Sequence, residues 1–139
     1  MTGNKTLTMI KPNAVEKGFT GAILAKINEG GFRIIAMKKM RLSKDQAEAF
    51  YEIHKDKPFF KDLVEFMTSG SIIAAFLEKE NAVEDYRKLI GATNPNQAEM
   101  GTVRNLFGTD VQKNAVHGSD SDENAEIEGS FFFSKLERF

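Results

Sequence analysis

A chain of 139 residues, 41% of them hydrophobic and 28% charged, can form one domain with a substantial core but not two, so we expect a single domain over residues 1–139. Its net charge of −1 provides no general basic surface, and therefore no nucleic-acid partner is expected. The absence of cysteine excludes disulfides, thiolate metal sites and thiol catalysis.

The N-terminus leads directly into a strand and lacks the apolar segment of a signal peptide. Over residues 6–11 the side chains alternate with a period of two, which predicts a half-buried strand that ends at Pro12. Lys11, at the end of this strand, either serves a function or extends into solvent. The longest apolar run, residues 72–77, is too short to cross a bilayer, so we expect a cytoplasmic protein with no membrane partner.

A helix and a second strand are expected next. Apolar residues recur at helical spacing over residues 19–28, and Gly30-Gly31 would end that helix. Residues 32–42 predict a strand whose inner face carries Phe32, Ile34 and Ala36.

Ser43 and Gln46 have the spacing of a capping box, which predicts a helix directly after them. Tyr51 and His54 fall on its apolar face. Tyr51 either belongs to that face alone or points its hydroxyl into a cleft.

Another helix is expected after Pro58, packed through apolar residues of 60–67. Phe59 lies off that apolar face. Two interpretations are open: an exposed ring on which a nucleobase stacks, or a surface phenylalanine covered by a loop or a second subunit.

Residues 71–77 are almost continuously apolar, which is typical of a central strand covered on both faces. A helix follows from Asn81, with Arg87 beside its apolar face, and ends at Gly91.

Residues 91–113 show no long element, although one helical turn is expected over 103–107. Loops of this length are usually functional or disordered. Thr93 and Arg104, among small residues, could wrap an anion, whereas Val103, Leu106 and Phe107 argue against disorder.

One of only two histidines follows this loop. Ala115 and Val116 suit a short buried strand, and residues 118–121 suit a turn that caps a helix beginning at about Asp122 and carrying its apolar face as far as Leu136. His117 is therefore expected at a strand end beside a stiff turn. It is either a catalytic side chain or a residue that only supports the turn.

The polar residues that the predicted elements could bring together suit a polyphosphate. They are Lys11, Arg87, Thr93, Arg104, Asn114 and His117. Because the sequence has no P-loop and no dinucleotide fingerprint, side chains would have to hold the phosphates. A neutral imidazole is a good phosphorus nucleophile, and Glu128 on the last helix either orients it or is a solvated helix residue.

The segment Asn114-Ala115-Val116-His117-Gly118-Ser119-Asp120-Ser121 resembles the active-site signature of nucleoside diphosphate kinases. Other blocks also resemble the family, in family order. They are residues 8–15, 58–60, 66–70, 91–95 and 101–104. Ser71 and Asn105-Leu106 depart from the usual family pattern.

The resemblance implies a ferredoxin-like fold, in which helices cover a four-stranded antiparallel sheet. It also implies γ-phosphate transfer from nucleoside triphosphates to diphosphates by a ping-pong route, with low base selectivity. His117 would be the phosphorylated nucleophile, supported by Glu128 and Ser119, and Phe59 would stack on the base. The residues that would hold the phosphates and sugar are Lys11, Tyr51, Arg87, Thr93, Arg104 and Asn114. Mg²⁺ would arrive with the nucleotide.

The resemblance further implies a homo-oligomer, either a hexamer or a tetramer. The main alternative is a non-catalytic ferredoxin-like module that binds nucleotides and regulates a partner. That module would need the same cations but no reactive histidine.

Overall fold

The computed structural model describes residues 3–139 as a four-stranded sheet and seven α-helices. The strands are β1 (Lys5–Ile10), β2 (Arg33–Met40), β3 (Ile72–Glu78) and β4 (Val116–Gly118). The helices are α1 (Pro12–Glu16), α2 (Thr20–Glu29), α3 (Lys44–Phe50), α4 (Phe60–Met67), α5 (Ala82–Ile90), α6 (Val103–Phe107) and α7 (Asp122–Phe132). Short 3-10 turns are η1 (Glu52–His54), η2 (Pro95–Gln97) and η3 (Lys135–Glu137).

The sheet has the strand order β2-β3-β1-β4, and every neighbouring pair is antiparallel. The predicted fold class, an α+β fold with a four-stranded antiparallel sheet, is therefore confirmed. The central position predicted for the strand at residues 71–77 is also confirmed, because β3 lies between β2 and β1 and is buried along nearly its whole length.

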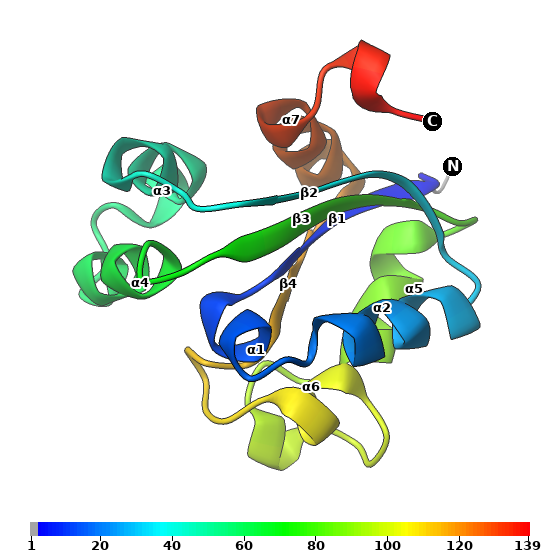
Figure 1. Cartoon of the computed structure of the whole chain (residues 1–139), viewed down its shortest axis with the longest axis horizontal. Helices are drawn as coiled ribbons and strands as arrows, with labels where there is room; N and C mark the ends of the chain where they lie inside the picture. The colour runs from blue at the N-terminus through cyan, green and yellow to red at the C-terminus, as the bar shows by residue number, and fades with distance from the viewer. Residues whose placement is uncertain (1–2) are drawn as a thin grey trace.

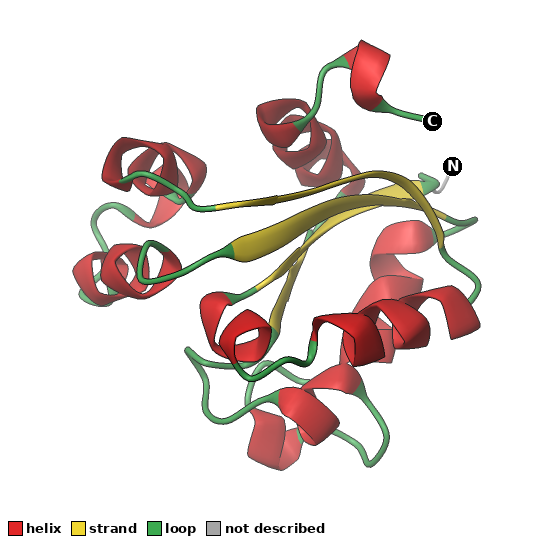
Figure 2. Ribbon diagram, in the orientation of Figure 1, coloured by secondary structure: helices red, strands yellow, loops and turns green. Residues whose placement is uncertain are grey.

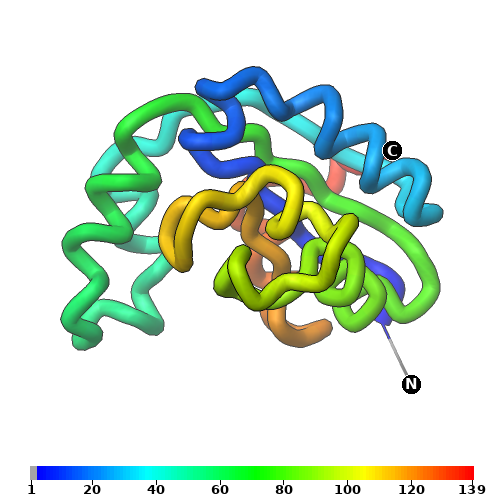
Figure 3. The backbone as a smooth tube through the Cα atoms, turned by 90° about the horizontal axis from the view of Figure 1, so that it is seen from below, coloured from blue at the N-terminus to red at the C-terminus, as the bar shows by residue number. Residues whose placement is uncertain are grey.

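Helices cover both faces of the sheet (Figures 1 and 2). One core lies under α3, α4 and α7 and is centred on Leu7, Met9 and Phe76. The other lies under α1, α2, α5 and α6 and includes Ile10 and Tyr86. Seen from below, the segment from α5 through α6 to β4 crosses this second face beside the α3–α4 hairpin (Figure 3).

The prediction that the first strand is half-buried is wrong. Thr6 and Thr8 are as fully buried as Leu7 and Met9, because helices pack on both faces of β1. The Thr8 hydroxyl has two hydrogen-bond partners in this interior, the Tyr86 hydroxyl at 2.6 Å and the His117 carbonyl at 2.8 Å. The buried Thr8 hydroxyl is thus satisfied by residues that are distant in the sequence, whereas the buried Thr6 hydroxyl has no partner among residues 3–139.

The inner face predicted for the second strand is also wrong in part. A β-bulge between Ile34 and Ala36 shifts the register, so Phe32 and Ile34 face one core while Ile35 and Ala36 face the other. A bulge adds a residue to one strand and breaks the alternation of its side chains.

Several predicted boundaries differ from those of the structure. Pro12 ends β1 as expected but also begins α1, because proline suits the first helical position. The capping box at Ser43 is confirmed, yet α3 ends at Phe50, which leaves His54 in the turn η1. The last helix ends at Phe132, and Leu136 is exposed beyond it. Within residues 3–139, no helix has both the length and the apolar character needed to span a bilayer.

Gly129 allows α7 to approach the sheet closely, and replacing it with alanine is expected to destabilise the protein. A Cβ atom there would lie 2.5 Å from Cζ of the buried Phe76. We expect overpacking to lower the free energy of unfolding by about 1–3 kcal/mol, which outweighs the gain in helix propensity. Gly21→Ala in α2 is the matched control, because nothing lies within 4 Å of its Cβ position. Equal stability changes for the two variants in urea denaturation would contradict the prediction.

Candidate active site

A cavity of about 570 Å³ gathers nearly all of the predicted site residues. Those that line it are Lys11, Tyr51, Phe59, Arg87, Thr93, Arg104, Asn114, His117 and Glu128. Ser119 does not line it but lies behind Glu128. The structure thus brings together side chains that are separated by more than a hundred positions in the sequence.

His117 lies within β4, where it pairs with Met9 of β1. The prediction of a short buried strand over Ala115 and Val116 is therefore right for Val116 and wrong for Ala115, because the strand begins at Val116. Ala115 precedes it with a positive φ of 76°, and the Val116 amide donates to the Asn114 carbonyl across it. Through this tight turn, the chain passes from Asn114 into the strand that carries His117.

The His117 ring is oriented by a carboxylate. Its Nε2 lies 2.8 Å from Glu128 Oε1, and the Ser119 hydroxyl donates to the same oxygen at 2.8 Å. The Leu7 amide in turn donates to the Ser119 oxygen at 3.1 Å. Because an ionised carboxylate only accepts, this contact favours the tautomer of a neutral imidazole in which Nε2 carries the hydrogen and Nδ1 keeps its lone pair.

Lys11 and Asn114 form a second connected group. Lys11 Nζ donates to Asn114 Oδ1 at 2.8 Å and lies 3.5 Å from the Gln112 carbonyl. The amide nitrogen of Asn114 donates to the Thr93 carbonyl at 3.0 Å. Lys11 is only 8% exposed, so it is not a lysine extended into solvent. Burial, with a smaller contribution from the Arg104 charge, lowers its pKa from 10.5 to about 7.

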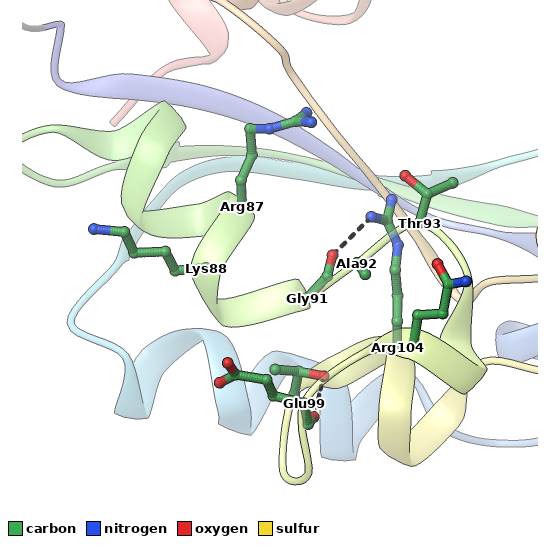
Figure 4. A pocket seen from close by; sticks show the side chains of 9 residues that line it. Arg87, Lys88, Gly91, Ala92, Thr93, Glu99 and Arg104 are labelled. Atoms are coloured by element: carbon green, nitrogen blue, oxygen red, sulfur yellow. Dashed lines mark hydrogen bonds between the residues drawn. The ribbon is translucent and has the colours of Figure 1, made fainter.

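Arg104 is held by backbone carbonyls rather than by a carboxylate. It donates to the Gly91 carbonyl at 3.1 Å and to the Val116 carbonyl at 3.0 Å. Burial lowers its pKa to about 10. Figure 4 shows its guanidinium beside Thr93, with Arg87 reaching from α5 toward the same region. An adjoining cavity of about 500 Å³ shares these three residues.

Three cations of the cavity take part in no ion pair within the part of the chain that the structure describes. None of the ion pairs among residues 3–139 includes Lys11, Arg87 or Arg104. Lys11 and Arg104 are buried, whereas Arg87 is exposed. Because buried charges are normally paired, Lys11 and Arg104 together favour an anionic ligand.

The other end of the cavity is apolar. Phe59 is 48% exposed at the start of α4, with its ring 5.6 Å from that of His54. Ile53 and Val111 line the same region and are also exposed. An accessible aromatic ring beside apolar side chains can bind a flat heterocycle by stacking.

Tyr51 is almost completely buried, and its hydroxyl has no hydrogen-bond partner within the part of the chain that the structure describes. Burial, together with the Glu128 charge, raises its pKa. Tyr51 lines the cavity, but its hydroxyl oxygen is itself buried, so a hydroxyl that points into the cavity stays a prediction.

The sequence from residue 4 to residue 138 matches the family described as "Nucleoside diphosphate kinase". The chain belongs to the nucleoside diphosphate kinase family. A relative of that name from Flavobacterium psychrophilum is 54% identical over 139 residues, which cover 100% of each chain. Another from Geobacter sp. (strain M21) is 56% identical over 133 residues, or 96% of this chain and 97% of the relative.

Solved nucleoside diphosphate kinase structures share the fold. That from Aquifex aeolicus superposes with a TM-score of 0.96 at 45% identity, covering 98% of this chain and 99% of the other. That from Halobacterium salinarum, in complex with CDP, has a TM-score of 0.94 at 36% identity, covering 99% of this chain and 91% of the other. The resemblance found in the sequence and the enzyme class that it implied, a phosphotransferase, are therefore confirmed.

Sequence reasoning missed several residues around the nucleoside diphosphate kinase cavity. Phe50 packs against His117, and Asp120 and Asn124 line the cavity beside it. Asp120 falls within the turn expected over residues 118–121, and no role at a site was predicted for Phe50 or Asn124. A helical pattern in the sequence identifies which face of a helix is buried, but it does not identify the helix or strand that this face packs against. The signal that existed was the crowding of polar residues after His117.

Proposed function

We propose that the chain, as one nucleoside diphosphate kinase domain over residues 1–139, transfers the γ-phosphate of a nucleoside triphosphate to a nucleoside diphosphate through a phosphohistidine on His117. One observation carries this proposal: Glu128 holds Nε2 of His117, which leaves the Nδ1 lone pair available in a cavity lined by three cations.

The reaction would proceed in two displacements. In the first, Nδ1 attacks the γ-phosphorus, an N–P bond forms, and the bond from phosphorus to the bridging oxygen breaks as the diphosphate leaves. In the second, a β-phosphate oxygen of the acceptor attacks the same phosphorus and the N–P bond breaks. Glu128 stabilises the positive charge that the ring gains when it is phosphorylated.

The cations have a clear task in this scheme. Lys11, Arg87 and Arg104 would neutralise the phosphate oxygens, whose charge is spread in the transition state. Thr93 and Asn114 would place the phosphates and sugar, and Tyr51 would contribute a hydroxyl to the same group. The bonds of Arg104 and Asn114 to backbone carbonyls fix both side chains before the nucleotide arrives.

Magnesium would enter with the nucleotide. No cluster of three or more His, Cys, Asp or Glu residues that could hold a metal occurs between residues 3 and 139. The carboxylates that line the cavity are Asp120 and Glu128, and Glu128 is already bonded to His117. This donor set fits an ion held mainly by the nucleotide and water, which would supply positive charge to the phosphates.

Stacking on Phe59 would give low base selectivity. Replacing Phe59 with alanine is expected to weaken binding of ATP, GTP, CTP and UTP by a similar factor of roughly ten, because every base has a face on which to stack. Titration of each nucleotide onto the variant measures this. Phe139→Ala is the matched control, since Phe139 is exposed and does not line the cavity. A loss confined to one base would argue against stacking.

Intact mass measurement tests the proposal directly. Incubation with ATP and Mg²⁺ is expected to add one acid-labile phosphoryl group, which added GDP or CDP removes. Nucleotide binding without an adduct on freshly prepared protein would instead favour the regulatory module. The homo-oligomer stays a prediction, and sedimentation would distinguish a tetramer from a hexamer.

A further inference from the structure

Within residues 3–139, the aromatic ring in direct contact with the His117 ring is that of Phe50. The two ring centroids lie 5.4 Å apart with an interplanar angle of 78°, which is an edge-to-face arrangement. Phe50 is the last residue of α3, is half-buried, and lines the same cavity as His117 and Glu128. The imidazole is therefore bounded by Glu128 at Nε2 and by the Phe50 ring.

Other aromatic rings hold Phe50 in this position. Tyr51 lies 4.9 Å from it in a near-perpendicular arrangement. From α7, Phe131 and Phe132 lie 5.4 and 5.5 Å away. Since Phe50 ends α3 whereas Phe131 and Phe132 belong to α7, Phe50 cannot leave His117 without loosening the packing of α3 against α7.

A single hydrogen bond at Nε2 does not fix the plane of an imidazole ring. The Phe50 contact restricts the remaining tilt and fills space that water would otherwise occupy beside the ring. This has a consequence for a two-step transfer, because a phosphorylated histidine must wait for the second nucleotide while water can attack it.

We propose that Phe50 is a positioning residue that holds the His117 ring and keeps water from its phosphorylated nitrogen, so that the phosphoryl group reaches a nucleotide instead of being hydrolysed. This inference rests on the proposed phosphohistidine. In the competing hydrolysis, the water oxygen bonds to phosphorus and the P–N bond breaks. The electron pair of that bond returns to Nδ1, and both water protons leave with the released phosphate.

The experiment compares phosphoenzyme lifetimes. The wild type, Phe50→Ala and Phe50→Leu are phosphorylated with ATP and Mg²⁺, freed of nucleotide, and followed by intact mass. We expect the phosphoryl group to be lost to water about tenfold faster in Phe50→Ala. Phe50→Leu keeps apolar bulk at the cavity wall and is expected to fall between the two. Phosphate release without an acceptor should rise in parallel.

Phe66→Ala is the matched control. Like Phe50, Phe66 packs partly buried against the core under α3, α4 and α7, but it does not line the cavity. Its phosphoenzyme is expected to decay as slowly as that of the wild type. Equal lifetimes for the wild type and both Phe50 variants would overturn the proposal, and so would equal acceleration in Phe66→Ala. If the wild type forms no adduct, the proposed function itself fails, which is a different outcome. Should Phe50→Ala fail to fold, Phe50→Leu decides.

Discussion

Replacing His117 with alanine is expected to abolish the phosphoryl adduct and to lower nucleotide-to-nucleotide transfer by roughly 10⁴-fold or more, as is usual when a covalent nucleophile is removed. The other groups that line the cavity would remain. Lys11 and Arg104 donate to other partners, and the His117 side chain is bonded to Glu128, so nucleotide binding should change little. The expected result is therefore loss of turnover with retained affinity, measured by a coupled assay and by ADP titration.

His54→Ala is the matched control, because the chain has only two histidines and both line the cavity. The His54 variant should still accept a phosphoryl group from ATP, even if its turnover falls. If the adduct survives in His117→Ala and disappears in His54→Ala, then His54 is the nucleophile and the proposal is wrong. If the adduct persists in both variants, then neither histidine is required for it.

Local sequence signals predicted those elements of the fold that depend on local physics. The capping box at Ser43, the continuous apolar run of β3 and the helix after Ser121 all follow from residues close together in the sequence. The misses depend on tertiary contacts. No local signal predicts the bulge between Ile34 and Ala36, because it places side chains on two cores at once.

The residues that line the cavity were predicted more completely than the boundaries of the elements, and for a different reason. Composition and spacing alone left His117, Phe59 and Glu128 with two interpretations each. The family resemblance implied a role for each of them, and the structure places all three around one cavity. What neither source supplied is the support behind the site. The bond from Thr8 to the His117 carbonyl and the Phe50 contact join residues far apart in the sequence.

The buried cations of the site lower the free energy of unfolding of the ligand-free protein. Lys11 is buried beside Arg104 with only neutral oxygens bonded to its ammonium group, so part of the stability of the domain is lost in keeping that charge ready for a phosphate. Active sites commonly sacrifice stability for function in this way. The argument predicts that removal of the charge has opposite effects on stability and on activity.

Lys11→Met is expected to stabilise the ligand-free protein at pH 7 while lowering transfer by about 10²-fold or more. The fall of the Lys11 pKa from 10.5 to about 7 on folding corresponds to roughly a few kcal/mol at about 1.4 kcal/mol per pH unit. Loss of the donor to Asn114 offsets about 1 kcal/mol of that gain. Urea denaturation of both proteins without nucleotide measures the difference.

The pH dependence of the stability difference between Lys11→Met and the wild type identifies the cause of that difference. Between pH 7 and 10.5 the unfolded wild-type chain binds a proton at Lys11 that the folded protein does not, so the wild-type free energy of unfolding rises with pH there. The advantage of Lys11→Met should therefore be full below pH 7 and shrink as the pH rises toward 10.5. Lys61→Met, at an exposed position on α4, should show no such trend. A constant advantage across this range would show that packing of the methionine is responsible, and not the buried charge. Added ADP should reverse the order of stability, because its phosphates supply the anion that Lys11 lacks.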